Sequence, residues 1–263
     1  MPSMADSKID ALFCMLKGEP GTRKSTQALS FPGPQYWFSY DRKMTAITLP
    51  MKEWKIDPKT IEYDDYSDWM SGEKKLKELV MKCPYKTVII DSITTLADAA
   101  NDQTKGNKSG TTTKAGDEKG HRVGGIIVNT LEDYKAEASV FQDLIKHCQN
   151  IRKYHKCNIV LIAHIVGERK TEEARMTHMA RIIVTGGKII SAKIPAKMEE
   201  IYHFNVKSAA DTAQEGKYSI ITSHSGDDYA RTCLPLEREI IFGNNPLYST
   251  YIKPAIDKLN NKP

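Results

Sequence analysis

The chain has 263 residues, of which 40% are hydrophobic and 27% are charged, and it carries a net charge of +5. This length and composition fit one large globular α/β domain, and they exclude a membrane protein, because no apolar run approaches the roughly 20 residues that a bilayer span needs. The five cysteines lie far apart with no C-x-x-C pair, which argues against a disulfide framework or a zinc site and favours the reducing cytoplasm.

Apolar, β-rich runs alternate with helical patterns along the first two thirds of the chain. The predicted strands cover 9–18, 35–39, 86–91 and 158–164, and the predicted helices cover 25–30, 67–82 and 131–155. The last third contains β-rich runs over 200–207, 217–222 and 229–236, followed by a short terminal helix. This order predicts an α/β fold with a mainly parallel sheet flanked by helices and a β-rich C-terminal part.

One polar segment interrupts this alternation. Residues Asn101–Gly125 are rich in Gly, Thr and Lys and contain almost no apolar residue before Val123. Connections of this length inside a compact domain are usually functional or disordered. We therefore expect a mobile loop at 101–125, inserted into a single domain that spans 1–263, with 233–263 as a C-terminal extension.

The sequence GEPGTRKST follows the first predicted strand and precedes the first predicted helix. It nearly matches the phosphate-binding pattern G-x-x-x-x-G-K-[ST], in which a strand, a tight loop and a helix N-terminus direct backbone N–H groups at one point. In this interpretation Lys24 neutralises the β- and γ-phosphates, Ser25 ligates Mg²⁺, and Thr26 lies near the α-phosphate. The predicted ATP-binding residues are Gly18, Glu19, Pro20, Gly21, Thr22, Arg23, Lys24, Ser25 and Thr26.

Arg23 stands where the pattern has its second glycine. Glycine is favoured where the backbone needs a positive φ or passes close to the ligand, and another residue there costs about 1–3 kcal/mol. Contacts with phosphate are worth roughly 1.5–3 kcal/mol each, and Gly21 leaves the loop one flexible point. We therefore expect an altered loop that still binds a nucleotide. The alternatives are a chance strand–turn–helix corner and a degenerate loop that binds poorly or not at all.

Three further polar residues stand at the ends of predicted strands. Asp91 ends an apolar strand, as does the acid that holds the Mg²⁺ water shell in P-loop ATPases, although a strand-capping role is the alternative. His164 ends the strand over 158–164 and is placed to sense the γ-phosphate, unless it only caps that strand. Asp41 follows the second strand, where a carboxylate can orient the attacking water; a solvated turn is the alternative.

Four strings of the sequence together resemble a known family. GEPGTRKSTQALSFPGP, YKTVIIDSITTLADAA, CNIVLIAH and VTGGKIISAKIPAKMEEIYHF are similar to the phage nucleotide-binding ATPases of RecA type, whose best-described members are the small RecA-like single-strand annealing proteins of the Sak group. The resemblance covers roughly Ile9–Thr232. It implies a RecA-like ATPase core that uses ATP and Mg²⁺, binds single-stranded DNA and promotes annealing or strand exchange. It also implies that Asp91 is the Mg²⁺-associated acid, Asp41 the acid of strand two, and His164 the polar switch of the sensor strand.

The same resemblance places DNA-facing loops at Asn101–Gly125 and Ile165–Lys188. Both segments carry Lys and Arg, which suit contact with the phosphate backbone, but neither carries aromatic residues that could stack on single-stranded bases. A solvated surface run is the alternative. The predicted DNA-binding residues are Lys105, Lys108, Lys114, Arg169, Lys170 and Arg175.

These features together predict a cytoplasmic ATPase, slow or DNA-stimulated, and the resemblance implies that it serves phage DNA recombination, in the host cytoplasm if a phage encodes it. The expected partners are single-stranded DNA, a single-strand DNA-binding protein and further copies of the chain, without a membrane. The predicted catalytic residues are Lys24, Asp41, Asp91 and His164, and the predicted metal ligands are Ser25 and Asp91. Two alternatives stay open: a helicase-type or packaging-type motor or loader ATPase, and a non-hydrolysing nucleotide-binding structural module.

Overall fold

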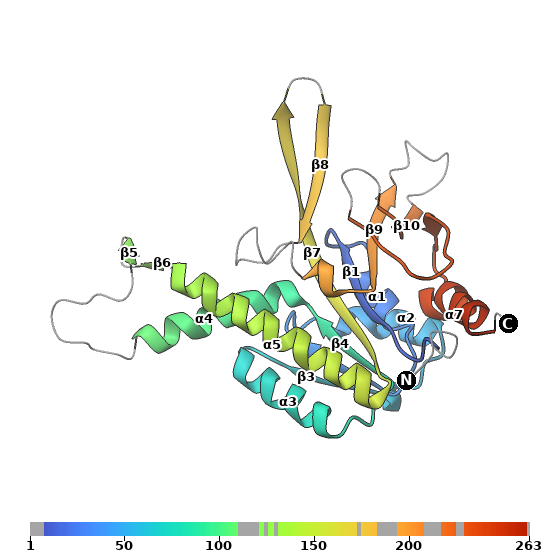
Figure 1. Ribbon diagram of the computed structural model, residues 1–263, viewed down its shortest axis with the longest axis horizontal. Coiled ribbons are helices and arrows are strands. Elements are labelled where there is room, and N and C mark those ends of the chain that lie inside the picture. The colour runs from blue at the N-terminus through green and yellow to red at the C-terminus, as the bar shows by residue number, and fades with distance from the viewer. Residues whose placement is uncertain are drawn as a thin grey trace, which may run out of the picture.

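One nine-stranded sheet forms the centre of the computed structural model, in the order β11-β10-β9-β1-β7-β4-β2-β3, with β8 paired to β7 (Figure 1). The structure describes residues 8–109, 121–123, 126–128, 131–172, 175–182, 194–207, 217–224 and 229–261. The strands are β1 (Phe13–Gly18), β2 (Gln35–Ser39), β3 (Ile61–Asp65), β4 (Thr87–Asp91), β7 (Asn158–Glu172), β8 (Arg175–Ile182), β9 (Glu200–Lys207), β10 (Lys217–Ile221) and β11 (Glu239–Ile241). A separate pair consists of β5 (His121–Val123) and β6 (Ile126–Val128).

The six strands from β9 to β3 are parallel, and β10 is antiparallel to both β9 and β11. Every residue of β1 and β2 is buried, as are the first four residues of β4. Parallel strands that are covered on both faces read as nearly continuous apolar runs. The runs that predicted these strands therefore reflect burial from two sides.

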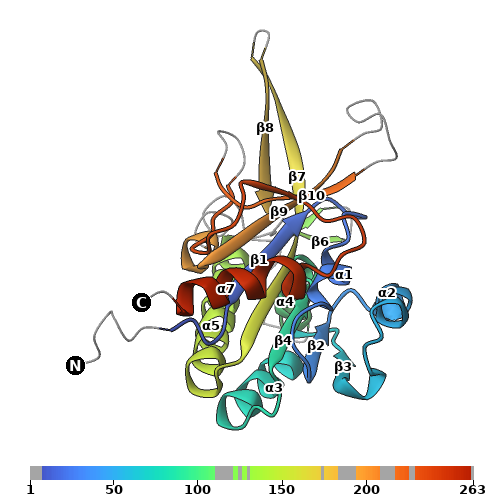
Figure 2. The same cartoon turned by 90° about the vertical axis from the view of Figure 1, so that its right-hand side faces the viewer.

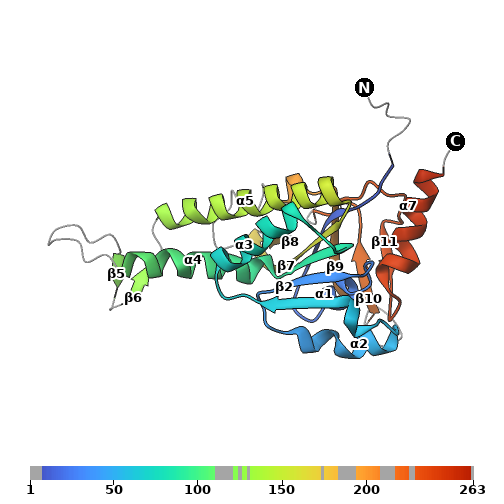
Figure 3. The ribbon, with the colours of Figure 1, turned by 90° about the horizontal axis from the view of Figure 1, so that it is seen from below.

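Two groups of helices cover the two faces of the sheet (Figure 3). One core cluster contains buried side chains of α3 (Trp69–Met81), α4 (Ile93–Ser109) and α5 (Leu131–His155), and the other contains those of α1 (Lys24–Ala28) and α7 (Lys253–Asn260). The short helix α2 (Thr48–Glu53) packs at the edge of the second cluster through its partly buried Met51. In the described part of the chain, we find no helix with the length and apolar character of a membrane span.

The short helical turns connect these elements. They are the 3₁₀ helices Met44–Ile47, Pro58–Thr60 and Pro195–Lys197, and the π-helical turn Tyr248–Ile252. The predicted strand at 35–39 and the predicted helix at 131–155 are confirmed with the same bounds. The helix predicted over 67–82 is confirmed as α3, and the terminal helix is confirmed as α7.

The chain after residue 233, which we expected as an extension, packs into the domain. Strand β11 pairs with β10, and Ile252 and Ile256 are buried against the same core as α1. The strand expected over 229–236 is wrong, because within this run only Arg231 pairs with the sheet, through a bridge to Ile201. The run is apolar in places because Ala230 and Leu234 are buried, and burial alone does not make a strand.

Helix α4 corrects the expected loop at its start, because it continues through Asn101 to Ser109. Leu96, Ala97 and Ala100 are buried against the core. A helix whose first turns are packed gains one backbone hydrogen bond for each further residue, so polar residues extend it without a core of their own. Residues 110–120 lie outside the described part of the chain.

Strand β7 corrects the expected loop at Ile165–Lys188. It runs past His164 to Glu172 and pairs with β8 from Ile165 opposite Ile182 to Glu172 opposite Arg175. This hairpin projects from the body of the protein, as Figures 1 and 2 show. A strand that begins in the sheet can be prolonged by an antiparallel partner that follows it closely in sequence. The residues after 182, up to 193, lie outside the described part.

Leu144 tests the packing of α5 on the sheet. It is fully buried, together with Phe141, Cys148 and Ile151 at three- and four-residue steps, which is the pattern of a helix with one apolar face. We expect Leu144→Ala to lower the free energy of unfolding by about 2–5 kcal/mol, because it leaves a cavity. The exposed neighbour Gln142→Ala is the control and should stay within about 0.5 kcal/mol of wild type in urea unfolding. Equal effects of the two changes would contradict this packing.

Candidate nucleotide site

The predicted site residues come together at the carboxyl ends of four adjacent strands. Gly18 ends β1 opposite His164 of β7, Asp91 ends β4, and Asp41 follows β2. Sheets of this kind bind ligands at the carboxyl ends of their strands. The fold therefore places the phosphate-binding sequence and three titratable side chains together at the carboxyl ends of the central strands.

The loop after β1 has little room at its first glycine. A Cβ on Gly18 would lie 2.6 Å from the carbonyl oxygen of Phe204 and 2.9 Å from Oγ1 of Thr22, so only glycine fits between the loop and β9. Gly21 has a φ of +82°, a conformation that glycine adopts without strain. The Thr22 hydroxyl donates to the carbonyl of Glu19 at 2.8 Å and closes the loop on itself.

Arg23 adopts the left-handed conformation at the place of the second glycine, with φ 66° and ψ 25°. Its guanidinium lies 4.0 Å from the ring centroid of Tyr218. Its Nη1 donates to the carbonyl of Gly243 at 3.2 Å and also to Oδ1 of Asn244. The backbone therefore keeps the conformation for which glycine is preferred, while the side chain contacts β10 and the turn after β11.

Lys24 lies at the centre of the loop and is 4% exposed. Its ammonium donates to the carbonyls of Gly18 at 2.9 Å and Glu19 at 2.8 Å. Burial lowers the pKa of Lys24 to about 8, although the nearby carboxylates of Asp91 and Asp41 oppose this shift. The ammonium is thus a buried cation that the loop's own carbonyls and the carboxylates of Asp91 and Asp41 stabilise in part.

Ser25 and Asp91 join the loop to β4. The Ser25 hydroxyl donates to Oδ2 of Asp91 at 2.7 Å. Burial raises the pKa of Asp91 to about 6, and the hydrogen bond from Ser25 and the charges of His164 and Lys24 oppose this shift only in part. Hydroxyl and carboxylate oxygens are the donors that Mg²⁺ prefers, with phosphate oxygens and waters as its other ligands. This donor set fits Mg²⁺ carried on a nucleotide; in the described residues no group of three or more acidic, His or Cys side chains forms a metal site by itself.

Asp41 is held by three side chains. The Ser92 hydroxyl donates to its Oδ1 at 2.9 Å, the Thr95 hydroxyl donates to the same oxygen, and Nε2 of His164 lies 3.3 Å from its Oδ2. Burial alone would raise the pKa of Asp41, but the hydrogen bonds from His164, Thr95 and Ser92 outweigh burial and hold this pKa below its usual range. Asp41 is therefore ionised at neutral pH.

His164 of β7 lies opposite Gly18 of β1 and contacts the Asp41 carboxylate. Its backbone N–H donates to the Thr94 hydroxyl at 3.0 Å, and its Nε2 contacts Asp41. Its other ring nitrogen, Nδ1, is buried and has no hydrogen-bond partner among the described residues. The ring therefore has one nitrogen in contact with Asp41 and one buried nitrogen without a hydrogen-bond partner among the described residues.

Three hydroxyl residues after Asp91 were not singled out in the sequence. Ser92 and Thr95 bind Asp41, and Thr94 binds the backbone of His164. The signal that could have found them is the run DSITT, in which three of the four residues after the acid carry a hydroxyl. The start of α4 brings these hydroxyls back toward the edge of the sheet.

The predicted DNA-binding residues lie outside the nucleotide site. Lys105 and Lys108 belong to α4, Arg169 and Lys170 to the projecting part of β7, and Arg175 to β8, while Lys114 lies outside the described residues. The hairpin is nevertheless continuous in β7 with His164. Strand β7 thus runs from His164, at the carboxyl ends of the sheet strands, into the segment that carries Arg169 and Lys170.

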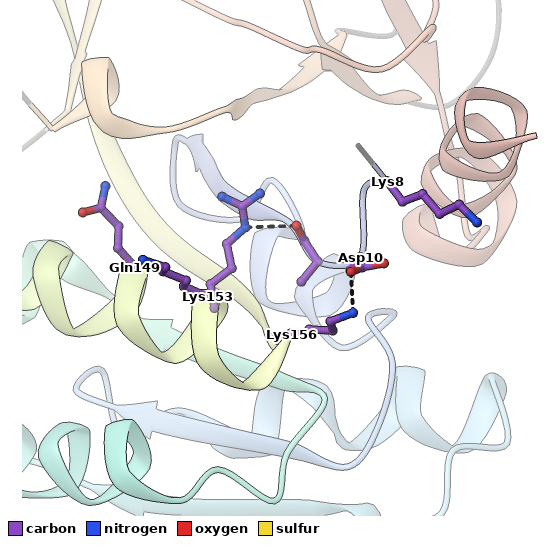
Figure 4. A pocket seen from close by; sticks show the side chains of 7 residues that line it. Lys8, Asp10, Gln149, Lys153 and Lys156 are labelled. Carbon is purple, nitrogen blue, oxygen red and sulfur yellow. Dashed lines mark hydrogen bonds and ion pairs between the residues drawn. The ribbon is translucent and has the colours of Figure 1, made fainter. Parts of the chain in front are cut away.

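A cavity of about 420 Å³ lies at the amino ends of β1 and β7, opposite the carboxyl ends where the candidate site lies. Figure 4 shows the basic side chains around this cavity. Arg152 donates to the carbonyl of Ala11 at 3.0 Å and pairs with Glu199 at 2.6 Å. Lys156 pairs with Asp10 at 2.7 Å. The contacts of Arg152 and Lys156 fasten the chain before β1 to α5.

Asp91→Asn tests the electrostatics of the site. A carboxyl whose pKa is raised in the folded state contributes stability that is full below the unfolded pKa of about 4 and is lost as the pH rises through the folded pKa of about 6. Asn does not titrate, so we expect the variant to gain about 3 kcal/mol relative to wild type between about pH 4 and pH 7. Urea unfolding in Mg²⁺-free buffer measures this gain. Asp65→Asn, at the exposed end of β3, is the control; a gain that does not depend on pH would contradict the burial of an ionised Asp91.

Comparison with known proteins assigns the chain to a family. The family model described as an AAA domain matches residues 11–233, from the residues before β1 to the segment after β10. No curated protein matches the chain. The match covers most of the chain, and the α/β sheet with its phosphate-binding loop is the architecture of a P-loop ATPase. The chain therefore belongs to the AAA domain family.

Proposed function

We propose that this protein is a Mg²⁺-dependent ATPase that couples its nucleotide state to single-stranded DNA bound by the β7–β8 hairpin. The observation that carries this proposal is the convergence of Lys24, Ser25 and Asp91 with the Asp41–His164 pair at one edge of the sheet. Membership of the AAA domain family supports the binding of a nucleotide. The resemblance to phage RecA-type ATPases of the Sak group supports the binding of single-stranded DNA.

The loop residues bind the triphosphate in this proposal. The backbone N–H groups after Gly18 and the ammonium of Lys24 contact the β- and γ-phosphates, and Thr26 lies near the α-phosphate. Ser25 and Asp91 would hold Mg²⁺, which neutralises charge on the phosphates during transfer. Lys24 would exchange its bonds to the Gly18 and Glu19 carbonyls for bonds to phosphate, and a phosphate nearby raises its pKa toward the usual value.

Asp41 positions the attacking water. A carboxylate with a lowered pKa is a weak base, so it orients water by accepting a hydrogen bond more effectively than it removes a proton. The hydroxyls of Ser92 and Thr95 fix one carboxylate oxygen, and His164 contacts the other. Phosphoryl transfer depends chiefly on such positioning and on charge neutralisation.

The β7–β8 hairpin is the proposed DNA-binding element. Its residues 165–182 contain Arg169, Lys170, Arg175 and Arg181 against Glu168, Glu172 and Glu173. Lysine and arginine on a projecting element suit contact with the phosphate backbone without reading the sequence. Since β7 carries His164 at the point where it leaves the sheet, a change at the γ-phosphate would reach the hairpin through one continuous strand.

Lys24→Ala and Asp41→Asn test the two halves of the ATPase. We expect Lys24→Ala to weaken ATP binding about 10- to 100-fold, because it removes charge-assisted hydrogen bonds to phosphate. We expect Asp41→Asn to lower kcat about 10²- to 10⁴-fold while ATP affinity changes little. Equilibrium titration with ATP and phosphate release measure the two effects.

The exposed Asp65→Asn, at the end of β3, serves as the control for Asp41→Asn. Unchanged ATP binding in Lys24→Ala would remove the nucleotide from the proposal. Tight ATP binding with no hydrolysis in the wild-type protein, with or without DNA, would instead identify a non-hydrolysing module. Hydrolysis coupled to movement along DNA, without annealing, would identify a motor or loader.

The double change Arg169→Ala and Lys170→Ala tests the hairpin. We expect weaker binding of single-stranded DNA and a dependence of log K on log salt that is less steep by about 1.4, since each lost phosphate contact contributes about 0.7. Fluorescence anisotropy of a labelled oligonucleotide at several salt concentrations measures both quantities. Lys146→Ala with Lys153→Ala, two exposed lysines of α5, changes the net charge equally and is the control. Equal loss in both double variants would show that only net charge matters.

A further inference from the structure

The side chain of Arg23 fastens the phosphate-binding loop to the C-terminal part of the chain. Its guanidinium packs on the ring of Tyr218 in β10, within the range of a cation–π interaction. Its Nη1 donates to the carbonyl of Gly243 and to the side chain of Asn244. One residue of the loop therefore has three contacts with residues that follow it by about 200 positions.

The turn that Arg23 contacts is itself tied to α1. We call residues 243–247 the C-terminal turn. Gln27 of α1 donates from Nε2 to the carbonyl of Asn245 at 3.0 Å and accepts at Oε1 from the N–H of Leu247 at 2.7 Å. Trp54, after α2, donates to the carbonyl of Asn244 at 3.0 Å. The turn is thus a fixed support that the helix after the loop holds in place.

We propose that Arg23 is a positioning residue that holds the phosphate-binding loop in its binding conformation by anchoring it to Tyr218 and the C-terminal turn, so that this turn sets the affinity of the loop for phosphate. The proposal rests on the proposed function, because it assumes that Gly18–Thr26 binds a nucleotide. It goes beyond that function in giving β10 and the C-terminal turn a part in nucleotide binding.

The physical reason is the entropy of the loop. A glycine at position 23 would reach the left-handed conformation without strain but would leave the loop free to adopt others, and ordering a free loop on binding costs affinity. Arg23 has the strain of a non-glycine residue in that conformation, and its contacts with Tyr218, Gly243 and Asn244 offset it. The loop is then ordered before the nucleotide arrives.

The alternative role for a cation in this loop is direct contact with phosphate. In the structure the guanidinium is instead engaged by one aromatic ring and two oxygen acceptors. Lysine would not reproduce these contacts, because a compact ammonium lacks the flat guanidinium face that packs on the Tyr218 ring while Nη1 donates to both oxygens. The two roles therefore predict different results for Lys at position 23 and for changes at Tyr218.

Five variants of the full-length protein test the anchor by titration with ATP and Mg²⁺: Arg23→Gly, Arg23→Ala, Arg23→Lys, Tyr218→Leu and Asn244→Ala. We expect Arg23→Gly to weaken ATP binding about five-fold, and Arg23→Ala to weaken it about 10- to 30-fold because the strain remains without the anchor. Tyr218→Leu and Asn244→Ala should weaken it about three- to ten-fold. Arg23→Lys should resemble Arg23→Ala, and Tyr229→Leu, an exposed tyrosine that belongs neither to the loop nor to the C-terminal turn, should resemble wild type.

Hydrogen exchange supplies a readout that does not depend on nucleotide. In the protein without ATP, Arg23→Gly and Tyr218→Leu should increase the exchange of amides in the loop over 18–26. When ATP binds, amides of the C-terminal turn should become more protected in wild type but not in Arg23→Gly. Thermal unfolding of each variant identifies any that fail to fold, and the exchange data then rest on Asn244→Ala, the mildest change.

The outcomes separate the anchor from the proposed function. Wild-type protein that does not bind ATP would overturn both the proposed function and the anchor's part in affinity. ATP binding in wild type with unchanged affinity and loop exchange in Arg23→Gly and Tyr218→Leu would overturn the anchor alone. Normal binding in Arg23→Lys and Tyr218→Leu, with loss in Arg23→Ala, would overturn the anchor and make Arg23 a phosphate ligand.

Discussion

The hydrogen bond between the Ser25 hydroxyl and the Asp91 carboxylate sets the geometry on which the rest of the site depends. It joins the first helix to the end of β4, although β7 lies between β4 and the strand that leads into the loop. Burial raises the pKa of Asp91 to about 6 and lowers that of Lys24 to about 8. Each shift favours the neutral form of its group because of burial, and the opposite charges of Lys24 and Asp91 offset this burial only in part. The ammonium, hydroxyl and carboxylate that converge here are the groups that would contact a triphosphate carried with Mg²⁺.

Contacts at the carboxyl ends of the strands also connect the site to the β7–β8 hairpin. The backbone N–H of Asp41 donates to the carbonyl of Asp91 at 3.1 Å, and the Asp41 carboxylate contacts His164 on β7. A displacement at the end of β4 therefore bears on Asp41, and through His164 on β7. Coupling of this kind needs a physical path with two arrangements. These contacts form a continuous chain of side chains and backbone from Asp91 to β7 along which such coupling could act.

Elements that leave an apolar run or an apolar helix face in the sequence could be predicted. Elements whose extent depends on contacts with other parts of the chain could not. Strands β2 and β4 were found because both of their faces are buried, and α5 because one face is. Strand β3 was missed because it is an edge strand whose residues after Ile61 are exposed and, apart from Tyr63, acidic, so that neither burial nor alternation marks them. The extension of α4 past Asn101 and that of β7 past His164 were missed because each continues an element that was stabilised earlier in the chain.

The site shows the same division. Gly18, Lys24, Ser25 and Asp91, which the structure brings together, were predicted as site residues because the phosphate-binding pattern and the end of an apolar strand are local signals. The hydroxyls of Ser92 and Thr95 were not, since their importance comes from the turn that brings them to Asp41. A sequence motif identifies residues that are neighbours in the chain, whereas the fold also brings distant residues together. The residues that the fold brings to Asp41, namely His164, Thr95 and Ser92, hold its pKa below the usual range.

Arg23 makes this distinction concrete. The preference for glycine in the loop is a statement about strain of about 1–3 kcal/mol, and strain of this size can be offset by a few good contacts. Here the backbone keeps the left-handed conformation, and the offsetting contacts come from Tyr218 and Asn244. Whether a residue that replaces the loop glycine impairs the loop therefore depends on the contacts that its side chain makes. At this position the side chain contacts Tyr218 and the C-terminal turn, so these contacts, and not the freedom of a glycine, hold the loop in its left-handed conformation.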